Sequence, residues 1–505
     1  MVFASIVFLS VFLPVVFLVH LVFRPIQVRN LWLIAASLLF YSYGEPVYVL
    51  LMLVSSVFNW GVALAIGAPR AKPLKSTELS DDSNSKPGEP GTPRNPETRR
   101  KILLTLAVVL NLGMLATFKY AAMIADTFGL LLHTDFNLPV LALPIGISFY
   151  TFQALSYVID VSRGKCAPNR NYCDVLLYIA FFPQLIAGPI VRYPDIAQAL
   201  SNRHATSEDI ALGLRRFVVG LSKKVIIADT LAVVADTIYN APSTEIDAGA
   251  AWLAALAFML QIYFDFSGYS DMAIGMARMF GFHYRENFIY PYVSQSIREF
   301  WRRWHRSLSS WFKEYLYIPL GGNRLGRPRA VMNKIVVFLL CGLWHGAAWT
   351  FVVWGLAHGF FLLLEEYLPI QRLPRILRHV YVLLVVLLTF VLFRADTFGQ
   401  AVLMWGRMFG APGAILPGSL ALSLLDPFTV CVLVGALIAM TPVTRLVEKV
   451  APALVGPATS AETTPRPPVV FRPSAVTFVG AFVLLVFDLL LLASGGYHPF
   501  IYFRF

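Results

Sequence analysis

The sequence predicts an all-α polytopic membrane protein, a helical bundle with broken or re-entrant helices and one amphipathic helix at the membrane interface. Of its 505 residues, 57% are hydrophobic and only 14% are charged, whereas soluble domains average roughly 25% charged residues. Apolar runs long enough to cross roughly 30 Å of hydrocarbon as helices recur along the chain. A soluble chain of this length would need far more polar surface, so a soluble multidomain protein is excluded.

The apolar runs define the candidate transmembrane spans. The first has no basic residues before it and no small-residue cleavage site after it, so we expect an uncleaved span. The candidates lie at about residues 2–23, 31–43, 47–66, 102–132, 144–160, 174–190, 210–238, 250–280, 331–364, 376–394, 400–416, 421–441 and 474–494. Within them, 181–190 reads FFPQLIAGPI. We expect a broken or re-entrant segment there, which is tolerated at membrane depth only against protein or a water-filled cavity.

A polar insert divides the chain. Residues 67–101 are rich in Pro, Ser, Lys and Glu and carry eight Lys and Arg residues, so we expect a disordered, cytoplasmic insert. It separates N-terminal spans, 1–66, from a central core, 102–396, which C-terminal spans follow at 397–505. Three spans before the insert place the N-terminus on the outer side.

The net charge is +12, but the basic residues lie in short segments between apolar runs. There they orient a membrane protein and contact anionic lipid, so we expect no nucleic-acid partner. The four cysteines lack CxxC spacing and no HExxH motif occurs, so we expect no metal site.

The segment 300–315 carries an amphipathic pattern. At 100° per residue its apolar side chains share one arc of the helical wheel, opposite the basic and hydroxyl side chains. The apolar set is Phe300, Trp301, Trp304, Leu308, Trp311, Phe312 and Tyr315. This predicts a helix that lies in the membrane interface. His305 falls at the edge of the arc, so we expect it to be half buried and able to face a cavity, or else to be an ordinary interfacial residue.

Two histidines interrupt the apolar segment 336–366. An ionisable residue inside a span is costly and suggests a functional site, although a neutral histidine costs less and can be structural. Small residues beside His345 leave space for a substrate. In an unbroken helix, His358 would lie about 20 Å further along the axis, so we expect His345 to be catalytic and His358 to have a packing or gating role.

Polar residues also occur in the apolar segment 261–278. Asp271 could pair with Arg278 or with the basic helix that follows, and we favour a structural buried pair over a catalytic carboxylate. The segment 393–396, FRAD, ends a span with aromatic and basic anchors, so we expect an architectural role.

Four stretches in this order resemble the membrane-bound O-acyltransferase superfamily. They are FFPQLIAGPIVRY at 181–193, FDFSGYSDMAIGMARMFGF at 264–282, FWRRWHRSLSSWFKEYLYIPLGGNR at 300–324 and GLWHGAAWTFVVWGLAHG at 342–359. Within the superfamily the chain is similar to the bacterial branch of alginate O-acetylases. The resemblance covers nearly the whole chain and implies a helical bundle of that family's type, with 102–396 as the catalytic core.

The resemblance implies acyl transfer from a cytoplasmic thioester, such as acetyl-CoA, to a hydroxyl beyond the bilayer, with no bound cofactor. The family's essential histidine, in its WHG motif, maps onto His345, and its second histidine, in WHxSLS, maps onto His305. We expect His345 to be the general base and His305 to orient the donor, polarise its carbonyl or bind the leaving thiol.

Further substrate contacts are expected from residues near the two histidines and from basic side chains that suit phosphates, although lipid headgroup contact is the alternative for the basic ones. The candidates are Trp344, Arg302, Arg303, Ser309, Lys313 and Asp271. The expected partners are acyl-CoA or an acyl carrier, an extracytoplasmic polysaccharide or a periplasmic acetyltransferase partner, and lipid of the bacterial inner membrane. The alternatives are a peptidoglycan or teichoic-acid acylation subunit, or a transporter without acyl chemistry.

Overall fold

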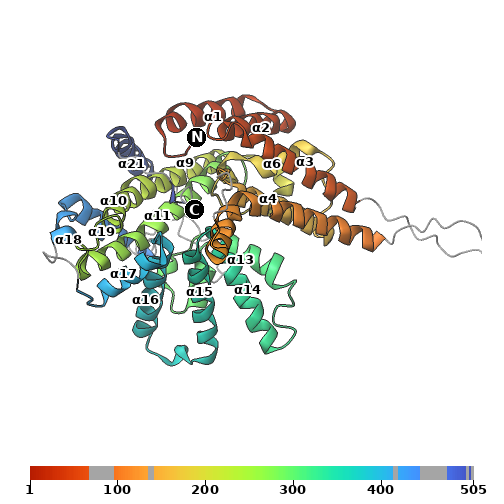
Figure 1. Ribbon diagram of the computed structural model, residues 1–505. Helices are drawn as coiled ribbons and strands as arrows, with labels where there is room; N and C mark the ends of the chain where they lie inside the picture. Colours follow the sequence, from red (N-terminus) through yellow and green to blue (C-terminus); the bar gives the residue numbers. More distant parts are fainter. Residues whose placement is uncertain (68–95, 135–140, 413–418, 444–474, 496–499, 502–505) are drawn as a thin grey trace, which may run out of the picture.

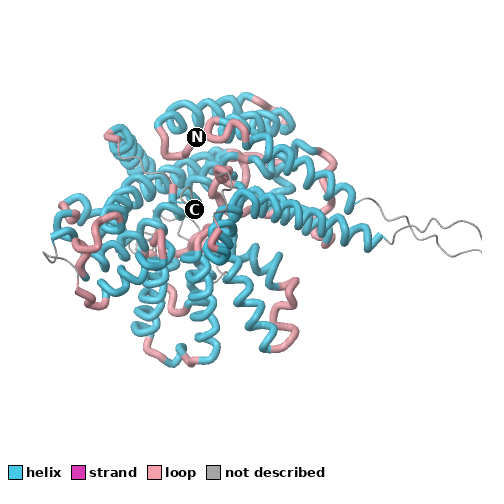
Figure 2. Tube along the Cα trace, viewed as in Figure 1, coloured by secondary structure: helices cyan, strands magenta, loops and turns pink. Residues whose placement is uncertain are grey.

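Helices account for every regular element in the part of the chain that the computed structural model describes, which is residues 1–67, 96–134, 141–412, 419–443, 475–495 and 500–501 (Figure 2). The stretch 451–473, whose prolines predict another loop, and most of the polar insert, 68–95, lie outside these residues. The last residues of the expected insert, 96–101, are helical and begin α4, so the insert ends earlier than expected.

The N-terminal helices and the start of the core follow the apolar runs closely. They are η1 (Phe8–Phe12), α1 (Leu13–Val22), α2 (Ile26–Ser42), α3 (Tyr48–Gly67), α4 (Pro96–Leu132) and α5 (Ile147–Ser162). Helices α3 and α4 pack on each other and on α5, and together they reach away from the rest of the molecule (Figure 1).

The segment 181–190 is broken, as the sequence predicts. Helix α6 (Tyr172–Ala180) is followed by the four-residue α7 (Phe182–Leu185), and no helix continues through Gly188 and Pro189. Every residue from 181 to 190 is buried, so this irregular backbone packs against protein rather than lipid. Helix α8 (Tyr193–Ser201) comes next.

The centre of the bundle is the contact between α9 (Ser207–Ser222) and α11 (Ala248–Met279). A Cβ on Gly275 would lie 2.6 Å from the carbonyl oxygen of Gly213, and one on Gly268 would lie 2.7 Å from that of Gly220. The glycines are seven residues apart in both helices, so each pair falls on one face. Small residues of this kind let helix backbones approach closely in membranes, which makes α11 the central helix.

The amphipathic segment 300–315 is not one helix. It forms α12 (Ile297–Arg303), α13 (Arg306–Phe312) and the π-helical turn η4 (Lys313–Tyr317), with a break at 304–305. Its aromatic face is buried within the protein. Trp311 stacks on Phe152 of α5 with 3.7 Å between ring centroids, and Trp304 contacts Phe390. The expectation of one continuous helix over 300–315 is therefore wrong. The aromatic face packs on protein, because the wheel cannot distinguish a lipid surface from an aromatic protein core.

The remaining helices complete the bundle. They are η2 (Lys223–Ala228), α10 (Asp229–Tyr239), η3 (Pro291–Val293), α14 (Arg327–His345), α15 (Trp349–Tyr367), η5 (Ile370–Arg372), α16 (Arg375–Arg394), α17 (Phe398–Met408), α18 (Ser419–Ser423), α19 (Pro427–Ala439) and α21 (Ala475–Ala493). Helices α14, α15 and α16 lie side by side (Figure 1).

Five of the described helices are long and apolar enough to cross a membrane. They are Tyr48–Gly67, Glu97–Leu132, Ala248–Met279, Arg375–Arg394 and Ala475–Ala493. The other expected spans are shorter or broken. For example, 210–238 is divided into α9, η2 and α10, and its buried Lys224 pairs with Asp229 and Asp265 at 2.6 and 2.9 Å.

Candidate active site

His345 is the last residue of α14, where the chain turns into α15. Gly346 continues with extended backbone, and α15 begins at Trp349. The two helices then pack closely, since a Cβ on Gly355 would lie only 2.3 Å from the carbonyl oxygen of Phe338. The expectation of one unbroken helix through 331–364 is therefore wrong. The separation of about 20 Å between His345 and His358, which depended on that helix, is wrong as well.

An aromatic cage surrounds the His345 ring. The ring centroids of Trp344, Trp354 and Phe393 lie 4.9, 5.0 and 5.2 Å from it, all edge-on. His345 is only 3% exposed. Phe393, which the sequence suggested was architectural, is thus part of the wall of this site.

His345 also lines a cavity of about 80 Å³, with room for roughly two or three waters. Trp344 and Lys119 line it too, and the segment 143–149 with Ile186 completes the wall. Lys119 is 9% exposed, and its Nζ donates to the carbonyl oxygens of Trp344 and His345 at 2.6 and 3.1 Å. The ammonium of α4 therefore holds the C-terminal end of α14, where a helix carries partial negative charge.

His305 is fully buried, not half buried as the wheel predicts. Its backbone is left-handed, with φ 40° and ψ 54°, which typically costs a non-glycine residue of order 1–3 kcal/mol and often marks a functional site. Asn287 fixes its ring. The Asn287 Oδ1 lies 3.2 Å from His305 Nδ1 and accepts from the Ser307 backbone N–H at 3.1 Å. Because Oδ1 is an acceptor, Nδ1 carries the proton and Nε2 keeps its lone pair.

Trp344 lies against both predicted histidines. Its ring centroid is 4.9 Å from that of His345 and 5.9 Å from that of His305. The structure therefore brings together three of the predicted site residues around one indole. His358 stays outside this group, hydrogen-bonded to Thr389 at 3.1 Å and packed edge-on against Trp354.

The polar side of α12–η4 carries four further candidates. Arg302 and Lys313 are exposed and Ser309 is partly exposed, while Arg303 is bonded to Glu299 and to the Ile289 carbonyl oxygen. Among the described residues that line the His345 cavity, none of these four appears.

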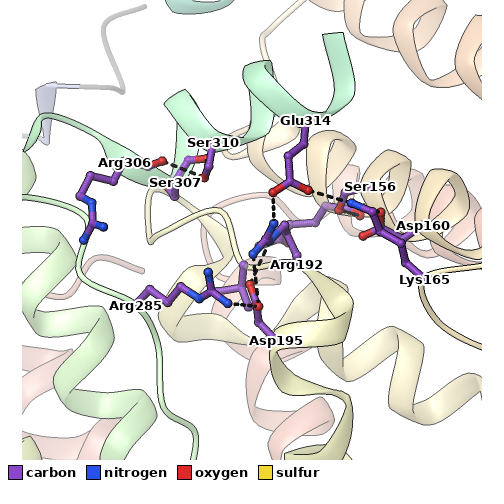
Figure 3. Close-up of polar contacts among 12 residues, drawn as sticks. Ser156, Asp160, Lys165, Arg192, Asp195, Arg285, Arg306, Ser307, Ser310 and Glu314 are labelled. Atoms are coloured by element: carbon purple, nitrogen blue, oxygen red, sulfur yellow. Dashed lines mark hydrogen bonds and ion pairs between the residues drawn. The ribbon is translucent and has the colours of Figure 1, made fainter. Parts of the chain in front are cut away.

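Figure 3 shows what holds this polar side in place. Glu314 of η4 is paired with Arg192 and, at 2.9 Å, with Lys165, and Arg192 also bonds Asp195, which pairs with Arg285. Partial burial would raise the pKa of Glu314, but the hydrogen bond from Lys165 and the charge of Arg192 outweigh it, so this pKa lies below its usual value.

Asp271 lies in a second cavity, of about 470 Å³. It accepts from Arg216 at 2.8 Å and from Lys223 at 2.6 Å. Neither expected partner, Arg278 nor the basic helix that follows, pairs with it: Arg278 bonds Asp209 instead, because Arg216 of α9 and Lys223 of η2 reach Asp271. Asn287 also lines this cavity, and His305, which Asn287 holds, is not among the described residues that line either cavity.

Sequence reasoning missed Lys119 and Asn287. The signal for Lys119 was present, since an ionisable residue within a long apolar run suggests function by itself. Asn287 sits in an irregular segment without periodicity, and only its contacts reveal it.

These features describe a candidate enzyme site inside a multi-pass helical bundle: the buried His305 and His345 both contact the Trp344 indole, and a cavity lies beside His345. Residues 169–393 match the MBOAT, membrane-bound O-acyltransferase family. The chain belongs to this family and is an acyltransferase.

Relatives support the assignment. The chain is 43% identical over 418 residues, 81% of this chain and 78% of the relative, to a protein of Azotobacter vinelandii named probable alginate O-acetylase AlgI. It is 35% identical to the peptidoglycan O-acetyltransferase of Helicobacter pylori, over 81% of this chain and 80% of the relative. It is 30% identical to the teichoic acid D-alanyltransferase of Bacillus subtilis, over 42% of this chain and 56% of the relative.

Proposed function

We propose that the protein moves an acetyl or similarly short acyl group from a cytoplasmic thioester to a hydroxyl of an exported, alginate-like polysaccharide, directly or through a partner protein. The observation that carries this proposal is the pair His305 and His345 on one indole beside a small cavity. The acyl transfer takes place in the bacterial inner membrane, which the polymer and the thioester approach from opposite sides.

His345 acts as the general base. It takes the proton of the attacking hydroxyl as that oxygen bonds to the thioester carbonyl carbon, and it returns the proton to the sulfur when the C–S bond breaks. Proton transfer of this kind contributes typically 10²–10⁴-fold in rate. The volume of about 80 Å³ at His345 suits a two-carbon acyl group.

His305 orients the donor from the other side of Trp344. Its Nδ1–H is engaged by Asn287, which leaves Nε2 to meet the thioester or the leaving thiol. One cavity reaches His345 and the other reaches Asn287, which holds His305, so we assign donor and acceptor to separate approaches. A thioester and a hydroxyl separated by about 30 Å of hydrocarbon need such an arrangement.

The donor is acetyl-CoA or another acyl thioester. Arg302 of α12 and Lys313 of η4 are exposed, and they supply positive charge for the phosphates of the donor. Arg303 is engaged in bonds within the protein and contributes less. Trp344 contacts the acyl group as part of the cavity wall.

Two polymers are candidates for the acceptor. Alginate is favoured by the relatives at 42–43% identity, and peptidoglycan is the second candidate because the Helicobacter protein is 35% identical over as much of the chain.

Expression in an alginate-producing strain that lacks its own O-acetylase tests both candidate acceptors, alginate and peptidoglycan. Acetyl esters should return to the alginate with the unaltered protein and not with His345→Ala at equal abundance. Esters on peptidoglycan alone would identify the second acceptor, and none on either polymer would overturn the proposal.

A further inference from the structure

Lys119 is a buried cation at the proposed reaction centre, and it has no part in the proton transfer assigned to His345. It lies in α4, lines the same cavity as His345, and is 226 positions away from it in the sequence. Two of its three ammonium hydrogens bond the carbonyl oxygens of Trp344 and His345. An ammonium has three donors, so one remains.

Burial of this charge is not offset by a carboxylate. Within the described parts of the chain, no Asp or Glu forms an ion pair with Lys119. Its compensation comes from the carbonyl end of α14, where cations are stabilised. A buried, unpaired charge is costly, so its retention beside His345 calls for an explanation beyond packing.

Support of the helix end alone does not require a cation. The neighbouring residue, Tyr120, performs the same task with a neutral hydroxyl, which donates to the Leu343 carbonyl oxygen at 2.6 Å. What distinguishes Lys119 from Tyr120 is its charge and its place in the cavity wall.

We propose that Lys119 is a further catalytic residue, whose Nζ donates a hydrogen bond to the oxyanion that forms when the hydroxyl attacks the thioester. This inference rests on the proposed function. As the C–O bond forms, the carbonyl π electrons move onto oxygen beside the ammonium. They return when the C–S bond breaks and the thiol leaves with the proton from His345. A preorganised charge at the position where charge develops is often the largest contribution to such catalysis.

Lys119→Gln and Lys119→Met test the proposal, with Tyr120→Phe as the matched control. Glutamine can still donate to the helix-end carbonyls but is neutral, and methionine keeps the shape of the side chain without donors. In purified protein with labelled acetyl-CoA, both variants should lower kcat about 10²–10³-fold, the usual effect of losing one oxyanion donor, with KM for the thioester changed only a few-fold. Tyr120→Phe should keep kcat within a few-fold of the unaltered protein.

The proposal is overturned if Lys119→Gln keeps kcat within a few-fold, or if Tyr120→Phe lowers kcat as much as Lys119→Gln does, because support of the helix end then explains both. If Lys119→Met does not fold, Lys119→Gln decides the outcome. His345→Ala in the same assay separates the two proposals. Its continued activity would overturn the proposed base, whereas an inactive His345→Ala with an active Lys119→Gln would overturn only the role of Lys119.

Discussion

Asn287 accepts a hydrogen bond from His305 across 3.2 Å, and the same oxygen accepts from the backbone N–H of Ser307. One amide thus fixes both the tautomer of the ring and the turn that carries it. Its nitrogen donates to Ser270 Oγ at 3.0 Å.

Asn287→Ala should therefore lower acyl transfer at least tenfold and destabilise the protein by about 1–3 kcal/mol, because it leaves buried donors unsatisfied. Ser270→Ala is the matched control, since it removes the hydrogen bond that the Asn287 nitrogen donates without touching His305, and it should keep most of the activity. Labelled acetyl transfer and thermal unfolding in detergent measure the two effects. Equal activity losses in both variants would contradict the positioning role.

His358 should be structural. It is fully buried and bonded to Thr389, so His358→Ala should cost about 1–3 kcal/mol of stability while measurable acyl transfer remains at low temperature. Activity per folded molecule is the quantity to compare with that of His345→Ala. A folded His358→Ala protein without activity would assign His358 to the chemistry.

The close contact of α14 and α15 predicts a sharp difference between two glycines. Gly355→Ala would force a Cβ to 2.3 Å from the Phe338 carbonyl oxygen, whereas Gly113 of α4 has nothing within 4 Å of a new Cβ. Gly355→Ala should destabilise the protein by about 1–3 kcal/mol and lower transfer by displacing His345. Gly113→Ala should do neither, and similar melting temperatures for the two variants would show that the helices can separate without cost.

The Glu314 cluster predicts a modest pH dependence of stability. A carboxyl whose pKa is lowered in the folded state stabilises the protein above its unfolded pKa, about 4.3 for Glu. That contribution is lost as the pH falls through the folded value. Near pH 7 the free energy of unfolding of the unaltered protein should exceed that of Glu314→Gln by up to about 1 kcal/mol, since partly exposed pairs contribute little. The difference should shrink below about pH 4, and a difference that grows in acid would contradict the pairing.

Much of the site could be predicted from the sequence, because His305, Trp344 and His345 stand in long motifs and apolar surroundings. The aromatic face of 300–315 was also predicted, but not the left-handed turn at His305, since periodicity carries no information about a single backbone dihedral. The turn after His345 could not be predicted for a similar reason. The apolar run 331–364 is compatible with one long helix and equally with two helices joined by a turn.

Lys119 and Asn287 could not be connected to the histidines from the sequence. Lys119 meets the end of α14 only through the packing of helices far apart in the chain, and Asn287 acts from an irregular segment. Such contacts follow from the tertiary arrangement of α4, α11 and α14, which local pattern does not specify.

The most direct test of the account is the transfer of labelled acetyl from acetyl-CoA by purified protein in lipid nanodiscs, with a soluble oligosaccharide as acceptor. The unaltered protein should form the acetyl ester, and His345→Ala, folded to the same melting temperature, should form none above background. Ester formation by His345→Ala at a rate near that of the unaltered protein would contradict the assignment of the base.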